Sequence, residues 1–406
     1  MTTMTDPPND QGFRLSQLIY DTRYRSATIQ VIALIAFMVI AAFLVRNTIT
    51  NLSALGKDID FGFLFSRAAY DINQKLIPYS SNDPHWRAAL VGLLNTLLVA
   101  ILGCILATVI GVVAGVLRLS NNWLTARIMT VYVESFRNIP VLLWILAFMA
   151  VLSESLPSPR AFRGEEAEAS MWLWNTIAVT NRGTYIPAPV WGPGSAIVVV
   201  IFLLSLLAIW AFGKWSQRRF EATGHLLPNF WIKLAILVGP TLLVYLLLGR
   251  PVAFSLPELA GFNFSGGIHL RNSMLALWLA LSFYTGAFIA EIVRSGILAI
   301  SKGQTEAAYA LGLRPSRTMN LVILPQALRV IIPPLISQYL NLTKNSSLAL
   351  AVGYMDLRST LGGTTLNTTG RELESMLLMM LIYLVVSLVI SSGMNFYNKT
   401  VRLKER

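Results

Sequence analysis

This sequence has very few of the residues on which most catalytic and metal-binding sites depend. Its 406 residues include one cysteine, Cys104, and three histidines, His85, His225 and His269, which lie far apart in the chain. A lone cysteine cannot form an intrachain disulfide. None of these residues stands in a nucleophile motif of the Ser-His-Asp or Cys-His kind, and the histidines are too scattered for a metal site. We therefore predict no catalytic residue and no metal ligand.

The sequence also lacks the phosphate-binding loop of an ATPase. The pattern Gly-x-x-x-x-Gly-Lys-Ser/Thr does not occur, and Gly213-Lys214 is followed by Trp215 and lacks the upstream glycine. We therefore predict that this chain binds no cofactor and does not hydrolyse ATP by itself.

Charged residues are scarce, at 13%, whereas hydrophobic residues make up 55% of the chain and the mean hydropathy is +0.60. This composition is typical of a membrane protein. Apolar runs of roughly 20 residues cross about 30 Å of hydrocarbon as helices, so the sequence predicts an all-α, polytopic fold with about eight transmembrane helices. The runs are 27–45, 88–117, 139–153, 196–212, 231–248, 274–297, 330–352 and 376–394.

The net charge of +12 comes from short basic clusters beside the apolar runs. A nucleic-acid-binding protein would carry a longer basic stripe, so we predict the lipid bilayer as a partner and no nucleic acid. By the positive-inside rule, the clusters place both termini and residues 302–325 in the cytoplasm. The first run has no small-residue cleavage site after it, so we interpret it as a retained anchor.

The second run carries small residues at a four-residue spacing: Gly103, Ala107, Gly111 and Gly115. This spacing places them on one helix face, where another helix can approach closely. We predict that this face packs against a second helix.

Several polar residues lie at membrane depth, where each costs about 2 to 3 kcal/mol unless it faces a partner or a wet cavity. The seventh run concentrates Gln338, Asn341, Lys344, Asn345, Ser346 and Ser347 within about three turns. We interpret this cluster as the lining of a solute path, with hydrogen bonding between helices as the alternative.

Two further groups of polar residues have two interpretations each. In the sixth run, Tyr284 and Glu291 interrupt an apolar face, and Arg294 follows Glu291 at the i,i+3 spacing of an ion pair. Either they line the path or the pair anchors the helix end. Arg137 and Asn138 precede a proline-initiated helix. They either form part of a gate or anchor the helix on the cytoplasmic side. The candidate residues for the solute path or gate are therefore Arg137, Asn138, Tyr284, Glu291, Asn341, Lys344, Asn345 and Ser346.

The polar segment after the sixth run predicts a helix, a sharp turn and a second helix across the membrane face. Thr305 is a plausible cap, and Glu306 then stands in the first turn, where the helix dipole favours an acid. Gly312 can adopt the positive φ that ends a helix, and Pro315 has the fixed φ that begins one. A well-capped loop with no partner would share these features.

The motif Glu306-Ala307-Ala308, then Gly312 and Ile323-Leu324-Pro325, resembles the cytoplasmic EAA loop of permease subunits in bacterial ABC importers. In that family the loop docks in a groove of the ATPase subunit. The phrases at 92–97, 134–140, 290–297 and 344–348 resemble the polar amino acid branch. The added anchor and a two-helix insertion resemble the larger first permease of general L-amino acid and glutamate/glutamine/aspartate/asparagine importers.

The resemblance implies the core of a type I ABC importer permease in the bacterial inner membrane. It also implies a second, related permease in a heterodimer, two ATP-binding subunits that use the ATP, and a periplasmic amino acid-binding protein. The cargo would be L-amino acids of broad range or, alternatively, glutamate, glutamine, aspartate and asparagine. The residues that the resemblance assigns to the ATPase-coupling loop are Glu306, Ala307, Ala308, Gly312, Pro315 and Pro325.

Other classes of membrane protein remain as alternatives. An ion-coupled secondary transporter would follow an ion gradient without an ATPase. An integral membrane enzyme, such as an acyltransferase, would need a cluster of nucleophilic or metal-binding residues that the sequence does not show.

The expected organisation follows from the runs and the resemblance together. Residues 359–365 are expected on the periplasmic side, as a flexible loop that contacts the binding protein or as a plain surface loop. The expected segments are a cytoplasmic tail at 1–26, an anchor at 27–46, the first part of the permease core at 88–154, the insertion with two transmembrane helices at 155–272, the second part of the core at 273–396 with the coupling loop at 302–325, and a cytoplasmic tail at 397–406.

Overall fold

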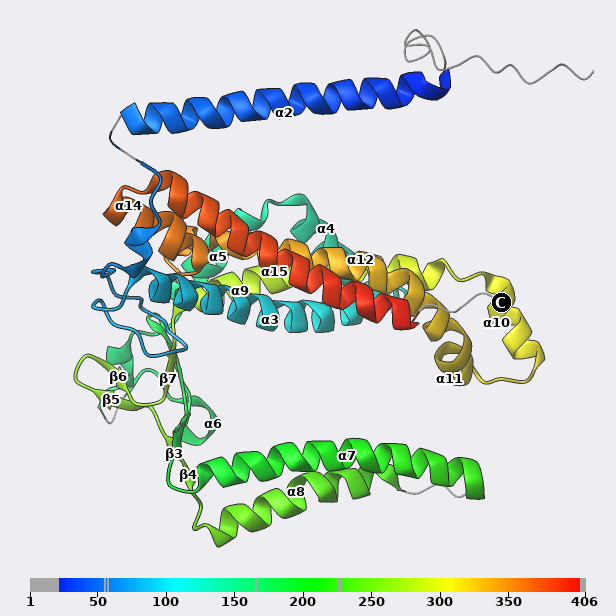
Figure 1. The fold of residues 1–406 in the computed structure, drawn as a ribbon. Coiled ribbons are helices and arrows are strands. Elements are labelled where there is room, and N and C mark those ends of the chain that lie inside the picture. Colours follow the sequence, from blue (N-terminus) through cyan, green and yellow to red (C-terminus); the bar gives the residue numbers. More distant parts are fainter. Residues whose placement is uncertain (1–21, 55, 57, 165–166, 225–227, 402–406) are drawn as a thin grey trace, which may run out of the picture.

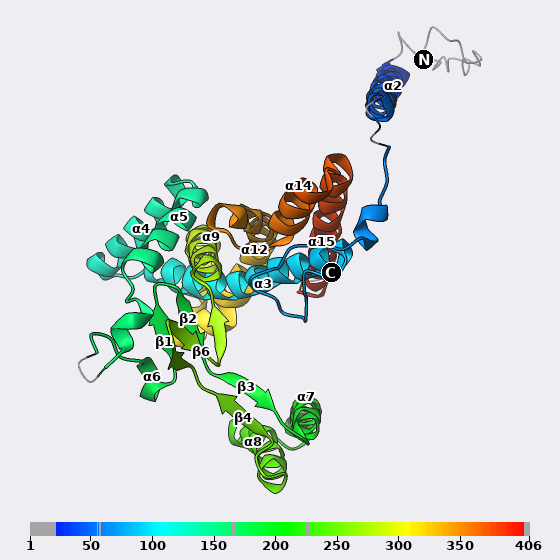
Figure 2. The ribbon, with the colours of Figure 1, turned by 90° about the vertical axis from the view of Figure 1, so that its left-hand side faces the viewer.

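The first long helix stands apart from the rest of the molecule (Figures 1 and 2). The computed structural model describes residues 22–54, 56, 58–164, 167–224 and 228–401, so most of the predicted N-terminal tail and residues 402–406 lie outside the described part. Helix α2 spans Thr22–Ala54. Its side chains are exposed along its length, as Phe37 is at 69%, which is expected of a helix whose surroundings are lipid.

A bundle of long helices forms the core. Helix α3 packs along α9, and small residues make that contact close: a Cβ added at Gly111 would lie 2.5 Å from the Cβ of Ile289. Gly115 faces α9 in the same way and Gly103 faces Leu342, so the predicted packing face is confirmed. The bundle helices are α3 (His85–Leu117), α5 (Val141–Glu154), α9 (Asn272–Leu298), α12 (Leu324–Asn345) and α15 (Glu372–Val401).

The predicted third span, 139–153, corresponds to α5, and a sharp bend separates it from the helix before it. Helices α4 (Trp123–Asn138) and α5 (Val141–Glu154) meet at 110° on either side of Pro140, which has an extended ψ and cannot continue α4. If this pair is counted as one span, the described residues hold eight candidate spans, which agrees with the number predicted.

The insertion contains short antiparallel strands as well as two long helices. Strands β1 (Ala178–Thr180), β2 (Gly183–Ile186) and β7 (Ile268–Leu270) form one sheet, β3 (Ala188–Trp191) pairs with β4 (Val252–Ser255), and β5 (Glu258–Ala260) pairs with β6 (Asn263–Ser265). Three short helical elements also occur before the core or in the insertion: η1 (Gly62–Phe65), η2 (Pro159–Phe162) and α6 (Trp172–Asn175). None of these strands was predicted.

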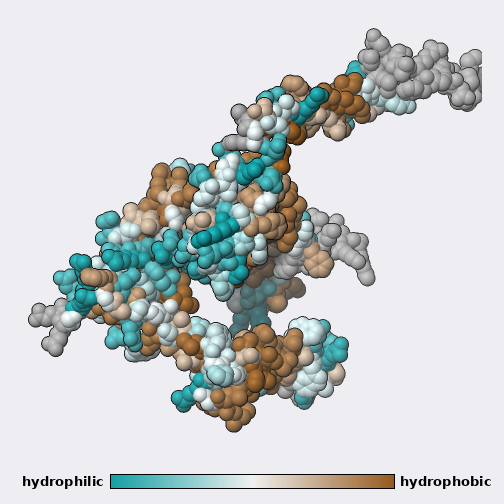
Figure 3. Space-filling model, turned by 60° about the vertical axis from the view of Figure 1, so that its left-hand side comes forward, coloured by the Kyte–Doolittle hydropathy of each residue, from teal (hydrophilic) through white to brown (hydrophobic). Residues whose placement is uncertain are grey.

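Helices α7 (Ser195–Thr223) and α8 (Asn229–Leu247) form a hairpin that the β3–β4 ribbon holds away from the core (Figure 2). Hydrophobic side chains gather over this hairpin and over α2, with hydrophilic side chains between them (Figure 3). Both elements therefore offer apolar surface to a bilayer.

Short helical elements join the last three spans. Between α9 and α12 lie α10 (Lys302–Ala310), α11 (Pro315–Thr318) and η3 (Met319–Ile323); between α12 and α15 lie η4 (Ser346–Val352), α13 (Leu357–Ser359), η5 (Thr360–Thr365) and α14 (Leu366–Thr369). The prediction of a flexible loop at 359–365 is wrong, because this segment is helical and Leu361 is fully buried. Gly362 packs there so closely that an added Cβ would lie 2.7 Å from the sulfur of Met379.

The long helices run between two ends of the molecule (Figure 1). The α10 end holds α10, α11, the start of α2 and the end of α15. The strand end holds the strands and the loop 58–84. The two described chain ends therefore lie at the α10 end.

Candidate functional site

Helix α10 ends in a Schellman motif centred on Gly312. The N–H of Gly312 donates to the carbonyl of Tyr309 at 2.9 Å, and the N–H of Leu313 donates to the carbonyl of Ala308 at 3.1 Å. Gly312 has a φ of +75°, which an L side chain adopts only with strain. The prediction that Gly312 ends this helix with a positive φ is confirmed.

The prediction that Thr305 caps α10 is wrong. The helix begins at Lys302, and Ser301 holds the N-cap position with an extended backbone and no side-chain cap bond. Thr305 and Glu306 therefore lie within the helix, and Ala307 follows them on the exposed surface. Residue type alone does not separate the two positions, because serine is at least as good a cap as threonine, and the backbone turns at Ser301.

The predicted helix start at Pro315 agrees with the structure, because Pro315 is the first residue of α11. Proline is tolerated there because its missing N–H would have no partner within the helix. Pro325 stands in the first turn of α12, directly after η3.

Apolar side chains on the α10–α11 segment are exposed. Leu311 is 82% exposed, and Tyr309 and Leu321 are also exposed, while Ala308 is buried against the chain. The segment lies beyond the ends of the bundle (Figure 1), where another protein could reach these exposed side chains. A surface of this kind suits a protein partner.

A cluster of five charged side chains lies where α3, α4 and α9 approach the α10 end. Glu291 accepts from Arg118 at 2.5 Å and from Arg294 at 2.7 Å. Arg137 lies 3.8 Å from Glu291, and Arg118 lies 3.9 Å from Glu134. The predicted pair Glu291–Arg294 is confirmed, and Arg137 joins it, but Arg118 was not predicted as a partner.

The other candidates near this cluster make local contacts. The ring of Tyr284 packs at 5.1 Å from that of Phe288, and the guanidinium of Arg137 lies 5.5 Å from the same Phe288 ring. The amide of Asn138 donates to the carbonyl of Glu134 at 2.8 Å within its own helix. Arg137 and Tyr284 therefore both contact the ring of Phe288.

The polar residues of α12 divide into two groups. Asn341 and Lys344 are exposed, Gln338 and Asn345 are half-buried, and Ser346 is buried with its hydroxyl donating to the carbonyl of Thr343 at 2.7 Å. The hydroxyl of Ser346 therefore already has a hydrogen-bond acceptor three residues earlier in the chain. The exposed group remains available to a solute or to another chain.

Lys344 lines a cavity of about 410 Å³ between α12 and α15. Two cations line it, Lys344 and Arg358, together with the hydroxyl-bearing Ser347, Tyr383 and Ser387. Such a lining suits a carboxylate.

Lys344 and Glu291 are not close together. Leu342 packs beside Gly103, whereas Val293 packs beside Gly115. These two glycines are twelve positions apart on α3, a rise of about 18 Å. One amino acid could therefore not contact both charges at once.

A network of neutral hydrogen bonds holds the strand end of α3. The amide of Asn95, which is fully buried, donates to the carbonyl of Gln74 at 2.7 Å and to that of Met355 at 2.9 Å. The hydroxyl of Thr96 accepts from the N–H of Leu357 at 3.0 Å. Residues 92–97 carry a motif of the family that the chain resembles, but the motif does not show their hydrogen-bond partners, which lie in other segments of the chain.

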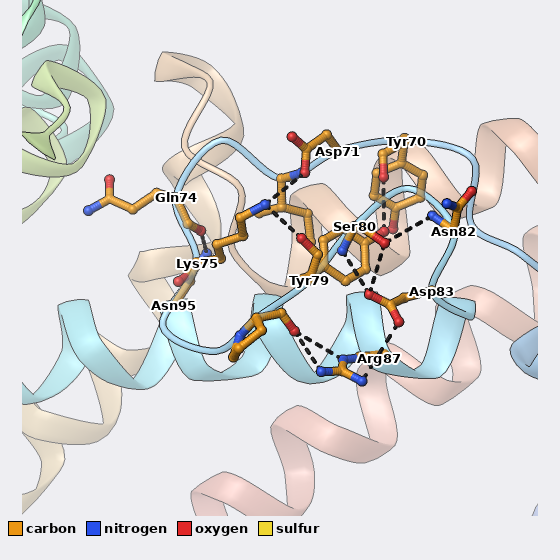
Figure 4. A network of polar contacts seen from close by, with 12 residues as sticks. Tyr70, Asp71, Gln74, Lys75, Tyr79, Ser80, Asn82, Asp83, Arg87 and Asn95 are labelled. Atoms are coloured by element: carbon orange, nitrogen blue, oxygen red, sulfur yellow. Dashed lines mark hydrogen bonds and ion pairs between the residues drawn. The ribbon is translucent and has the colours of Figure 1, made fainter. Parts of the chain in front are cut away.

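The loop that supplies Gln74 is itself held down on α3 (Figure 4). Arg87 donates to the carbonyl of Pro78 at 2.7 and 3.1 Å, and Lys75 donates to the carbonyl of Tyr79 at 2.7 Å. Tyr70 shares a hydrogen bond with Thr365 at 2.8 Å. The loop therefore connects α3 to the segment before α15.

Asp356 is the one fully buried carboxyl group among the described residues, and it lies between two spans. One carboxylate oxygen accepts from the N–H and the hydroxyl of Ser359 at 2.9 and 2.8 Å, and the other accepts from Tyr383 at 3.2 Å. Burial raises the pKa of Asp356 above its ordinary value, and the hydrogen bonds oppose that shift. No pattern in the sequence distinguishes this aspartate.

Comparison with known proteins identifies relatives along the whole chain. The family described as "Binding-protein-dependent transport system inner membrane component" matches residues 107–403. The glutamate/glutamine/aspartate/asparagine transport system permease protein BztB of Rhodobacter capsulatus is 57% identical, over 100% of both chains. The general L-amino acid transport system permease protein AapQ of Rhizobium johnstonii is 43% identical, over 99% of this chain and 98% of that protein.

Among solved structures, the crystal structure of an amino acid ABC transporter with histidines aligns with 78% of this chain and 95% of its own. The TM-score is 0.45 and the sequence identity is 17%.

Proposed function

This chain belongs to the family of binding-protein-dependent transport system inner membrane components, and from this premise we propose how it acts as the permease subunit of an amino acid ABC importer. The earlier resemblance to such permeases is confirmed by relatives that match its full length. The chain is a polytopic protein of the inner membrane. The proposal concerns the range of amino acids carried, the partner subunits and the residues that couple to the ATPase.

We propose that the cargo is L-amino acids, and that acidic amino acids and their amides are among them. The name of the relative at 57% identity covers glutamate, glutamine, aspartate and asparagine, and that of the relative at 43% covers L-amino acids in general. The cationic lining of the cavity at Lys344 and Arg358 supports a carboxylate-bearing cargo. Uptake competition among labelled glutamate, glutamine and an apolar amino acid separates the narrow range from the broad one.

The α10–α11 segment is the proposed docking site for a separate ATPase. It carries the coupling residues Glu306, Ala307, Ala308, Gly312 and Pro315, with Pro325 following in the first turn of α12, and its exposed Leu311 and Tyr309 would become buried on docking. Two ATP-binding subunits would serve two permeases, and ATP would be used only by those subunits. The α10 end would then be cytoplasmic, as the basic clusters indicate.

The exposed face of α12 is the proposed site of the second permease and of the solute path. Ser337, Asn341 and Lys344 recur every three or four residues, so they lie on one face of the helix. A polar side chain exposed to lipid at membrane depth costs about 2 to 3 kcal/mol, so this face needs a protein partner or water. A second, related permease across it would enclose a path, into which a periplasmic binding protein would release the amino acid.

Closure of the ATPases on ATP would displace α10 and α11. Three residues separate α9 from α10, and α11, η3 and α12 follow one another without a break. A displacement of the segment would therefore move α9 and α12 together and open the path alternately to the two sides.

The test is co-purification of the complex from detergent-solubilised membranes. Gly312→Asp adds a side chain at a positive φ, and Gly303→Asp adds the same side chain in the same helix without a positive φ; neither new Cβ meets an atom within 4 Å. We expect Gly312→Asp to insert in the membrane but to recover at least tenfold less ATPase, and Gly303→Asp to recover it normally. A wild-type chain that transports alone, without an ATPase, would indicate an ion-coupled transporter instead.

A further inference from the structure

Glu291 joins three helices at one point. Its Oε2 accepts from Arg118 at the end of α3, its Oε1 accepts from Arg294 of α9, and Arg137 of α4 lies 3.8 Å away. The side chain of Arg118 is only 10% exposed and that of Glu291 is 27% exposed, so water competes weakly for these contacts. One carboxylate therefore fixes the relative positions of α3, α4 and α9.

This point is close to the proposed coupling segment. Glu291 lies about two helical turns before α9 ends at Leu298, and α10 begins at Lys302. Helix α9 is in tight contact with α3 at the same level, where a Cβ added at Gly115 would lie 2.7 Å from the carbonyl oxygen of Ala290. A displacement of α10 is therefore passed along α9 to this cluster within about two helical turns.

Both carboxylate oxygens of Glu291 already have short hydrogen bonds, so neither is free for an amino acid. The cluster holds three arginines and two glutamates, and removal of Glu291 would leave three like charges close together with only Glu134 to oppose them. The Nε of Arg294 is buried without a partner among the described residues, so this arginine depends on Glu291. These observations favour a mechanical role over a place in the solute path.

We propose that Glu291 is a positioning residue that transmits movement of the α9–α10 unit to α3 and α4, and so couples ATP use to transport. The proposal rests on the proposed function, because it requires an ATPase at α10. It departs from the interpretation of Glu291 as a path-lining residue.

The experiment measures amino acid imported per ATP hydrolysed in proteoliposomes that contain the full complex, with binding protein and glutamate. Glu291→Gln keeps the size of the side chain and removes its charge, and Glu134→Gln makes the same change in the same cluster at a side chain that is 51% exposed. We expect Glu291→Gln to assemble and hydrolyse ATP but to import at least tenfold less per ATP. Glu134→Gln should stay within twofold of wild type.

A general loss of folding would lower import and hydrolysis together, so the ratio reports on coupling. A wild-type ratio in Glu291→Gln would overturn the proposal. If that variant does not assemble, Glu291→Asp decides: a lowered ratio in an assembled complex supports the proposal, and a wild-type ratio or failure to assemble overturns it. Failure of the proposed function would instead appear in the wild-type complex, as import that does not depend on ATP.

Discussion

The two ends of helix α3 are held by opposite kinds of contact. At the strand end, Asn95 and Thr96 make neutral hydrogen bonds with segments more than 250 residues away, and both side chains are buried. At the α10 end, Arg118 joins a cluster of charges that water partly reaches. Buried neutral groups cost about 1 to 3 kcal/mol each when a partner is lost, whereas the more exposed contacts of the cluster, such as that of Arg118 with the 51%-exposed Glu134, contribute about 0 to 1 kcal/mol.

The difference indicates that the two ends of α3 have different roles. The strand end can rearrange only at a large cost, so it is suited to hold its half of the bundle in place. At the α10 end three arginines share two carboxylates, so a contact that is lost can be replaced by another within the cluster, which suits the end where an ATPase is proposed to act. We expect substitutions at the strand end to lower stability most, and those at the α10 end to alter coupling with less effect on stability.

The largest effect is expected from Asn95→Leu. The substitution leaves the carbonyls of Gln74 and Met355 without their donor in a buried site, and we expect a loss of about 2 kcal/mol or more in the free energy of unfolding. Asn138→Leu is the matched control at the α10 end, because Asn138 is exposed and bonds only within α4. Thermal unfolding of the two purified variants measures both losses, and equal losses would contradict different roles for the two ends of α3.

The next effect in size is a pH dependence at Asp356. Burial raises the pKa of this carboxyl group in the folded protein. Its stabilising contribution is therefore present below the ordinary pKa and is lost as the pH rises through the raised one. Asp356→Asn keeps an oxygen for Ser359 and cannot ionise, so its Tm should rise relative to wild type as the pH increases above about 4, the ordinary pKa of the group.

The control for Asp356 is Asp71→Asn, which changes an exposed carboxylate in the loop before α3. The pKa of Asp71 is lowered by the N–H of Ile72 and by Lys75, so its pH dependence has the opposite sign. A Tm difference between Asp356→Asn and wild type that stays constant across the pH range would show that ionisation of Asp356 does not destabilise the folded protein.

The features that the sequence predicted correctly depend on neighbouring residues. Apolar runs, the glycine after α10 and the i,i+3 pair Glu291–Arg294 all have their partners within a few positions. Contacts between distant segments could not be predicted in this way: Arg118 and Glu291 are 173 residues apart, and no local pattern links them. The i,i+3 pair of the ion cluster could therefore be predicted, but the contact between distant segments could not.

Short or unusual elements were missed for other physical reasons. The strands of the insertion have three or four residues each, which is too few for an alternating pattern to show. Glycines at 362 and 363 were interpreted as signs of flexibility, but Gly362 serves a close contact with Met379. A glycine by itself does not distinguish these two uses. The family and its eight spans could be predicted, but not the packing of residues 346–365.

The smallest effect is expected from Glu134→Gln, and it tests the ionic end directly. The carboxylate lies 3.9 Å from Arg118 and is 51% exposed, so we expect a loss of at most about 0.5 kcal/mol in stability. Salt should reduce this loss, because the Debye length falls from about 10 Å at about 0.1 M to about 3 Å at about 1 M. The loss in Asn95→Leu involves no charge and should not change with salt. Thermal unfolding of both variants at the two salt concentrations measures the contrast, and a salt-independent loss in Glu134→Gln would mean that packing, not charge, holds the α10 end.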